Sequence, residues 1–328
     1  MGVKAMNTSK LVGTATFMVL ILFVVPWLIA ISGRWDFYYT LTSVALLSIA
    51  SAGVWLTFYI GRINIGQGAF ALLGGYTTAI LVTEANVSFW LALPLSGLLA
   101  AFISILIGLP ILRLRGVYFA MVTLVLTEVA KLTALALPIT NGAKGICNLP
   151  LPGALSIFGI TLIPDFKGIA NTKLAFYYLA VILMILCFAG MYRLVNSRLG
   201  HICRSMQQNE ELASSIGVNV ASIRVLIFAI SSFLGGIGGS TFVMISHSIY
   251  PSSFQIADSV NFMLNCFLGG LGYVFGPMLG TVVLYFGWDL LFETGNFQML
   301  IYSAILIGLM LLLPNGLLSL RLFRGGRP

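Results

Sequence analysis

Long stretches of nearly uncharged, apolar residues recur along the whole 328-residue chain and restrict its fold more than any other feature. A helix needs about 20 apolar residues to cross the hydrocarbon core of a bilayer, and its backbone groups then bond within the segment. No stretch shows the alternating pattern of a barrel strand. Ten transmembrane segments are predicted, at residues 11–31, 37–60, 63–83, 89–112, 116–137, 174–194, 222–244, 259–272, 275–292 and 297–313.

The composition favours a membrane protein over a soluble one. Hydrophobic residues make up 59% of the chain and charged residues only 8%, which is too little polar surface to face water on all sides. The 35 glycines suit close packing between membrane helices, because small residues let two backbones approach. We therefore expect an all-α polytopic membrane protein with a single transmembrane domain over residues 1–328.

Two of the ten segments differ from the others. Residues 11–31 follow two lysines, as a signal peptide would, but this apolar run is longer than the roughly 7–15 residues usual in signal peptides. An uncleaved span is therefore expected. Residues 259–272 are too short to cross comfortably and end in a glycine cluster, so a broken or re-entrant helix is the alternative there.

The lysines and arginines predict the orientation. With the amino terminus in the cytoplasm, 12 of the 17 basic residues fall on the cytoplasmic side, four fall outside, and Lys131 lies within a span. This division agrees with the positive-inside rule and places both termini in the cytoplasm. It also accounts for the formal charge of +8 without nucleic acid, because no basic run with interleaved aromatic residues occurs.

Two connections between the predicted spans are long. Residues 138–173 form an external loop with four prolines, which could cap a path or receive a partner. Residues 195–221 form the one sizeable cytoplasmic loop. Good helix formers run within it from Arg204 to Ile216 and end at Gly217, which predicts a short amphipathic helix over 204–216 outside the membrane.

No catalytic constellation is visible in the sequence. His201 and His247 are predicted to lie on opposite sides of the membrane, and carboxylates do not cluster. The four cysteines are widely spaced, which suggests neither a metal site nor a disulfide framework. The phosphate-binding motif G-x-x-x-x-G-K-[ST] is also missing. We expect no enzymatic activity and no cofactor bound by this chain, so its energy must come from another subunit or an ion gradient.

Polar residues inside two spans mark candidate sites. Asn64 and Gln67 lie among glycines at 61–82, either at close helix contacts or where a broken helix exposes its backbone to an aqueous path. In the span 116–137, Glu128 and Lys131 lie three residues apart on one helical face. Ionisable residues at that depth mark a path or a paired structural element. An internal ion pair and a polar lining of the path are both open.

Five blocks of sequence follow one another between residues 61 and 280. They are GRINIGQGAFALLGGYTTAILV, RLRGVYFAMVTLVLTEVAKL, NGAKGICNLP, RLGHICRSMQQNEELASSIGVN and GGLGYVFGPMLG. In this order they resemble the LivM type of permease from the high-affinity branched-chain amino acid ABC importers. The chain departs from the family pattern at Asn141, Ala143, His201 and Gln207 to Asn209, which bears on the substrate more than on the fold.

The resemblance implies a role for the helix at 204–216. It would be the coupling helix, which transmits the closure of an ATPase dimer to the membrane helices. A mostly uncharged helix with small residues on its surface would fit a cleft on another protein. The positions that match the family's coupling loop are Arg204, Glu210, Leu212, Ala213 and Gly217.

The resemblance also implies an assembly in the bacterial inner membrane. A second related permease would form a hetero-dimer with this chain, two cytoplasmic ATPase subunits would bind ATP, and an external substrate-binding protein would deliver the cargo. Branched-chain or other aliphatic amino acids are the expected cargo, moved by alternating access between the permeases. Urea or a short amide is the alternative. A different class is an ion-coupled secondary transporter with a proton relay through Glu128 and Lys131. The candidate path residues are Asn64, Gln67, Thr123, Thr127, Glu128 and Lys131.

Overall fold

Helices dominate the fold. The computed structural model describes residues 36–157, 160–163, 166, 172–291, 295, 297–313 and 316–318. Its helices are α2 Asp36–Tyr59, α3 Gln67–Thr83, α4 Phe89–Ile111, α5 Val117–Ala136, α6 Thr172–Val195, α7 Arg198–Gln208, α8 Glu210–Ser215, α9 Val220–Ser246, α10 Ile256–Gly269, α11 Gly276–Leu290 and α12 Gln298–Leu312. Nine of the ten predicted segments coincide with a helix. The tenth, 11–31, lies outside the described residues, as do both termini.

The helices fall into two length classes. Five of those described are long and apolar enough to cross a membrane, namely α2, α4, α5, α6 and α9. Helices α3, α10, α11 and α12 have 14 to 17 residues. At 1.5 Å per residue they are roughly 21–26 Å long, short of the ~30 Å hydrocarbon core. The short segment predicted at 259–272 is therefore a short helix, and the ten complete crossings stay a prediction.

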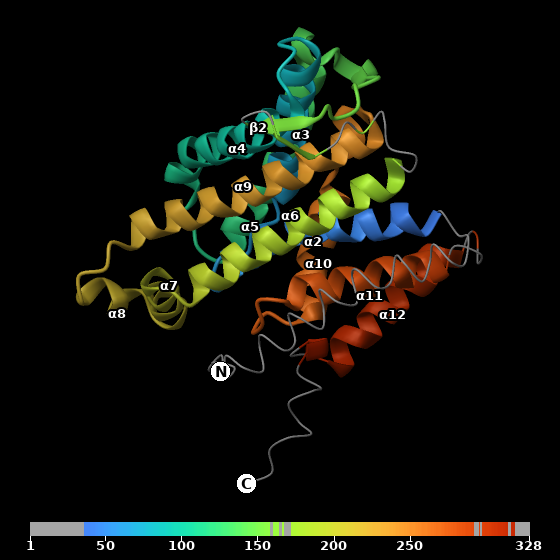
Figure 1. The fold of residues 1–328 in the computed structure, drawn as a ribbon. Helices are drawn as coiled ribbons and strands as arrows, with labels where there is room; N and C mark the ends of the chain where they lie inside the picture. Colours follow the sequence, from blue (N-terminus) through green and yellow to red (C-terminus); the bar gives the residue numbers. More distant parts are fainter. Residues whose placement is uncertain are drawn as a thin grey trace.

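Helix α9 is the centre of the bundle. It packs against α2, α3 and α4, and Figure 1 shows it running between them. Its glycines permit these contacts, since a Cβ at Gly239 would overlap the backbone of Ala71 in α3, and Gly74 meets Gly236 in the same way. Lipid provides no hydrophobic drive for helix association, so this close backbone contact stabilises the pair through van der Waals packing.

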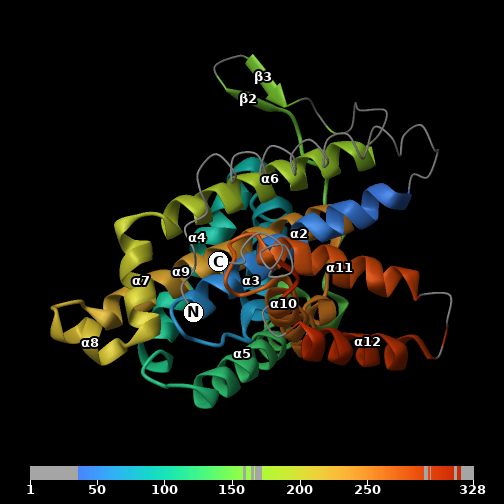
Figure 2. The same cartoon turned by 90° about the horizontal axis from the view of Figure 1, so that it is seen from below.

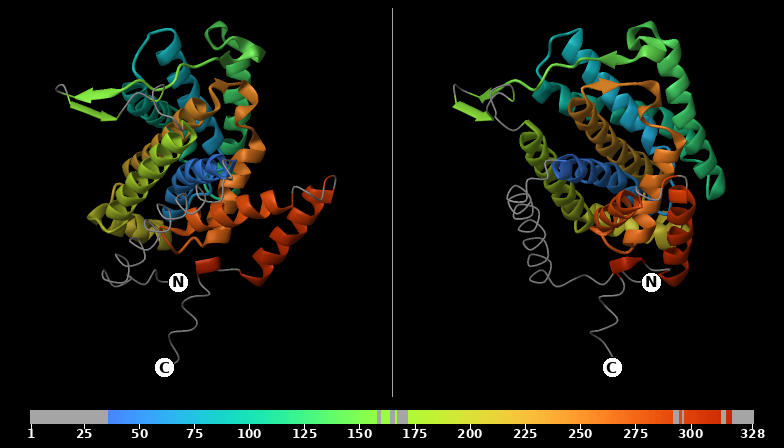
Figure 3. Two further views of the ribbon diagram at one scale, coloured as in Figure 1. Left: turned by 45° about the vertical axis from the view of Figure 1, so that its right-hand side comes forward. Right: turned by 90° about the vertical axis from the view of Figure 1, so that its right-hand side faces the viewer.

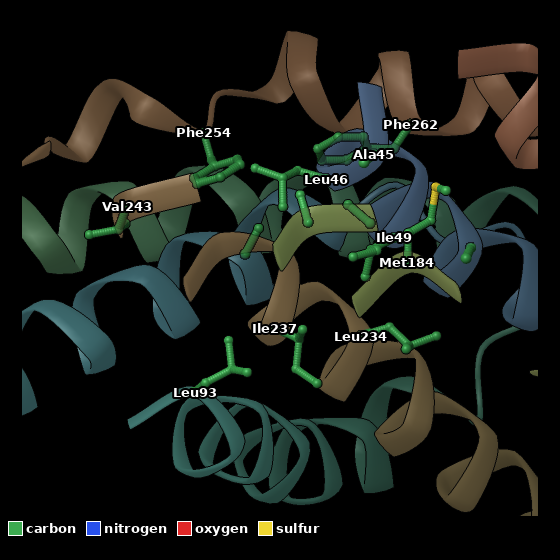
Figure 4. Packing of buried hydrophobic residues seen from close by; sticks show 14 of the residues in the cluster. Ala45, Leu46, Ile49, Leu93, Met184, Leu234, Ile237, Val243, Phe254 and Phe262 are labelled. Atoms are coloured by element: carbon green, nitrogen blue, oxygen red, sulfur yellow. The ribbon is translucent and has the colours of Figure 1, made fainter. Parts of the chain in front are cut away.

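The buried apolar side chains gather where α2, α6, α9 and α10 meet. Figure 4 shows Ile49 of α2, Met184 of α6, Leu234 of α9 and Phe262 of α10 within this cluster. Helix α5 is different, because it lies at one side of the bundle with α12, while α6 lies at the opposite side (Figure 2). The core is therefore built by the middle helices, and α5 keeps one long face open.

Two small sheets follow α5 and α9. Strand β1 (Ile146–Cys147) pairs antiparallel with β4 (Ser248–Ile249) after the end of α9. Strands β2 (Leu155–Ile157) and β3 (Ile160–Ile163) form a hairpin that stands away from the helices (Figure 3). The indole Nε1 of Trp90 donates to the carbonyl oxygen of Gly153 at 2.9 Å. The long loop predicted at 138–173 is thus fastened to α4 and to the end of α9.

The two long loops lie at opposite ends of α9. Helices α7 and α8 lie beside its first turn, and β1 and β4 lie beyond its last turn (Figure 1). His201 is in α7, whereas His247 follows α9 in a left-handed conformation. The two histidines are therefore at opposite ends of this helix, the arrangement that the predicted topology requires.

Candidate functional site

The loop between α6 and α9 contains two helices, so the prediction of one continuous helix over 204–216 is wrong. Asn209 is extended, with φ −154° and ψ 108°, and its side-chain oxygen accepts from the amide of Leu212 at 3.0 Å. Asparagine is a preferred N-cap, because its short side chain satisfies an otherwise unbonded amide. It therefore ends α7 and begins α8. Gly217 has φ +88° and follows α8 at the predicted C′ position.

Helix α7 is tied to the end of α2. The hydroxyl of Tyr59 donates to the carbonyl oxygen of Gly200 at 3.2 Å. The side-chain Nε2 of Gln207 donates to the carbonyl oxygen of Phe58 at 3.2 Å. Arg204 is half-buried on α7. Burial raises the pKa of the Cys203 thiol to about 11, so this cysteine is protonated at neutral pH and serves packing.

Glu210, at the start of α8, lies among three arginines of its own chain. Its Oε2 is 3.5 Å from Nη2 of Arg62, its Oε1 is 3.5 Å from Nη2 of Arg115, and it also pairs with Arg224. Arg62 is only 4% exposed. Burial lowers the pKa of Arg62, and the charge of Arg115 adds to this effect, although a guanidinium remains charged in proteins. We call these four residues the Glu210 cluster.

The Glu210 cluster joins parts of the chain that are far apart in sequence. Arg62 belongs to the connection between α2 and α3, Arg115 to the connection between α4 and α5, and Arg224 to the first turns of α9. One carboxylate therefore fixes α8 to two connections and to the start of α9 at the same end of the bundle. The family resemblance predicts a coupling role for Glu210, but its three arginine partners are not predicted. In the sequence these arginines bear only on the orientation in the membrane, although each stands near the end of a predicted span.

The surface of α8 differs from the prediction at one position. Ala213, expected on the docking surface, is buried, because α8 turns this face toward the bundle. The exposed apolar residues are Leu212 and Ile216, at 63% and 72% exposure. They lie four residues apart and hence next to each other. The apolar surface that a partner could reach on α8 and at its end is therefore Leu212 and Ile216.

Asn64 and Gln67 form a fully buried polar network at the break between α2 and α3. The Asn64 Oδ1 accepts from the amide of Gly66 at 2.9 Å, and the Gln67 Nε2 donates to the carbonyl oxygen of Ser231 in α9 at 2.9 Å. The Ser231 hydroxyl donates in turn to the carbonyl oxygen of Gly53 in α2 at 2.7 Å. Both side chains therefore stabilise the contact of α2, α3 and α9.

Hydroxyl groups from two further helices bond the amides at the start of α3. The Thr123 Oγ1 of α5 accepts from the amide of Ile65 at 3.1 Å, and the Ser259 Oγ of α10 accepts from the amide of Gly68 at 2.9 Å. Thr127 lies 3.2 Å from the same Ser259 oxygen. These bonds favour the close-packing interpretation of the break over a backbone open to water. A role of these residues in a path stays a prediction.

Glu128 and Lys131 form an ion pair, which is one of the two arrangements that the sequence left open. The Lys131 Nζ donates to Glu128 Oε1 at 2.9 Å, and both side chains are partly exposed. They lie on the open face of α5 among exposed apolar residues, which include Met121, Val125 and Leu132. Charges facing lipid are costly, so intramembrane charges normally face protein or water. An ion pair among exposed apolar side chains therefore distinguishes the open face of α5 from a face suited to lipid alone.

The fold and these sites define a polytopic, α-helical integral membrane protein. Its apolar helices are long, it carries an ion pair on an apolar face, and it holds a folded loop at one end by a charged cluster. Within this class the chain belongs to the family described as branched-chain amino acid transport system / permease component, whose model matches residues 37–314.

Curated relatives carry related names. The chain is 29% identical over 316 residues to the high-affinity branched-chain amino acid transport system permease protein LivM of Salmonella typhimurium, covering 89% of this chain and 74% of the relative. It is 30% identical over 276 residues to LivM of Escherichia coli, covering 79% and 64%. The permease protein BraD of Pseudomonas aeruginosa is 26% identical, with 79% and 87% covered. No solved structure matches this chain.

Proposed function

We propose that this chain is the permease subunit of an ATP-binding-cassette importer that carries branched-chain or other aliphatic amino acids. The family match over residues 37–314 supports the transport class, and the names of the relatives support the cargo. The observation that carries the mechanism is α8, which presents exposed Leu212 and Ile216 while the Glu210 cluster holds it against the membrane helices.

The proposed coupling step runs through α7 and α8. The exposed pair Leu212 and Ile216 enters a cleft on a cytoplasmic ATPase subunit, which binds and hydrolyses ATP. Movement of that subunit displaces α8, and Glu210 passes the displacement to the connections around α2, α4 and α9. Of the predicted coupling residues, Leu212 makes the contact. Arg204, Glu210, Ala213 and Gly217 set the position and shape of the loop.

The proposed path runs along the open face of α5, at the contact with a second permease, and opens by alternating access. Glu128 and Lys131 lie on this face, and Asn64, Gln67, Thr123 and Thr127 lie behind it. A substrate-binding protein meets the outer end, where the loop 138–173 lies. Both termini are cytoplasmic, and the membrane is the bacterial inner membrane.

Docking of α8 is tested with Leu212→Ser and Ile216→Ser combined in the assembled importer. Removing two exposed apolar side chains from a packed contact lowers the recovery of the ATPase with the permease and abolishes uptake. The matched control is Ile216→Val, which keeps an apolar side chain and should retain both the recovery of the ATPase and the uptake. Undiminished ATPase recovery in the double serine variant would contradict docking through this pair.

Uptake assays separate the remaining alternatives. Radiolabelled leucine should accumulate in vesicles that hold the complete importer and ATP, and urea should not. Vanadate, which traps ATPase subunits, should stop this uptake, and a protonophore should leave it intact. Uptake that collapses with the protonophore and ignores vanadate would support the ion-coupled class.

A further inference from the structure

A groove lies between α4 and α9 at the end of the bundle that carries α7 and α8. It has a volume of about 430 Å³, within the ordinary size of a small-molecule site. The helices α4 and α9 pack against each other along this stretch, and Figure 1 shows them side by side. Its apolar wall includes Ile105 and Leu109 of α4 and Val225, Leu226 and Ala229 of α9.

The groove is apolar along its length and positive at one end. Ile105, Leu109 and Leu226 remain exposed on the outer surface of the bundle. Arg113 and Arg224 lie where the groove reaches the end of α4 and the start of α9. A ligand that fits this arrangement has an apolar chain and an anionic head.

Both arginines have unused capacity for an anion. Arg113 is exposed and makes no ion pair within the described part of the chain. Arg224 is buried, with only 8% of its surface exposed. Its Nη2 pairs with Glu210, but its Nε has no hydrogen-bond partner. The groove also includes Ala221 and Ser222 in the first turn of α9, where the helix dipole favours phosphate.

The Glu210 cluster leaves positive charge in excess at this end. One carboxylate serves three guanidinium groups, and Arg113 adds a fourth cation beside them. We propose that the groove binds one anionic phospholipid, with an acyl chain along Ile105, Leu109 and Leu226 and with its phosphate on Arg113 and Arg224. The phosphate balances the excess positive charge of the arginines. The lipid holds α4 against α9 next to the proposed coupling loop.

Native mass spectrometry of the purified full-length chain tests this site. Phosphatidylglycerol and phosphatidylcholine with identical acyl chains are added in parallel. The wild-type chain should retain one phosphatidylglycerol with an affinity at least about tenfold above that for phosphatidylcholine. Both lipids carry a phosphate, but the choline ammonium of phosphatidylcholine cancels its net charge and is repelled by the excess arginines. Equal affinity for the two lipids would overturn the proposal.

Two arginine variants give the matched comparison. Arg113→Gln removes a cation from the groove without disturbing a contact of the described chain, and it should weaken phosphatidylglycerol binding about tenfold. Arg198→Gln removes an exposed charge from α7, away from the groove, and should bind as the wild type does. Equal loss of phosphatidylglycerol binding in both variants would show a general effect of charge and contradict the proposed site. Unchanged binding by Arg113→Gln would also contradict it.

The apolar part of the groove is tested separately. Glycerophosphoglycerol carries the same charged phosphodiester head without acyl chains, so it should not displace phosphatidylglycerol at equal concentration. Displacement would reduce the groove to a simple anion site and contradict the proposal. Loss of the bound lipid when the ATPase subunits are added would also contradict it, because the arginines would then belong to a protein contact.

Discussion

Replacing Glu210 with Gln should destabilise the end of the bundle that holds α8. At 3.5 Å and an effective dielectric constant of about 20, one charge pair interacts by roughly 5 kcal/mol. Arg115 is 65% exposed and contributes little. Arg62 and Arg224 are buried, and removing the only carboxylate of a buried pair costs about 3–5 kcal/mol, because the remaining charges lose their partner. Glutamine still accepts hydrogen bonds, so the lower end of this range is expected.

Thermal unfolding of the detergent-solubilised chain, followed by size-exclusion chromatography, measures the effect. The Glu210→Gln variant should lose its monodisperse peak several degrees below the wild type. The matched control is Glu211→Gln, because Glu211 is the exposed neighbour and makes no ion pair in the part of the chain that the structure describes. If both variants unfold at the same temperature, the Glu210 cluster does not stabilise the fold, and this reasoning is refuted.

Three further results are expected. Glu128→Gln leaves Lys131 without its partner and should lower the amount of protein in the membrane, as measured by immunoblot. Adding Lys131→Met should restore that amount. A double variant with as little protein as the single one would contradict the pairing. Gly239→Ala should lower the unfolding temperature because the new Cβ overlaps the backbone of α3. In the control Gly238→Ala the new Cβ makes only ordinary contacts, so the temperature should not change. Equal shifts in the two variants would refute the close approach of α9 to α3. Finally, an impermeant maleimide should label the exposed Cys147 only from outside, and labelling only from inside would invert the topology. The buried thiol of Cys203 in α7 should stay unlabelled between pH 7 and 9, because its pKa of about 11 keeps it protonated.

The sequence alone determined which parts of the described chain are apolar helices. Every predicted segment within the described residues became a helix, because uncharged runs such as 89–112 admit no other structure in lipid. The spacing of Glu128 and Lys131 placed both on one helical face without help from the rest of the fold, and the structure then showed that they pair. Gly217 marked the end of the loop helix for an equally local reason, its positive φ.

The tertiary structure decided what depends on contacts between distant residues. Nothing local shows that Glu210 gathers Arg62, Arg115 and Arg224, because the helices that bring them together are ordered only by packing around α9. Burial of Ala213 was likewise invisible, since the helix propensity of a short loop does not say which face meets the bundle. The groove between α4 and α9 exists only once those helices cross. Periodicity and charge therefore determine the elements, whereas long-range packing alone determines which charges and apolar faces remain for partners.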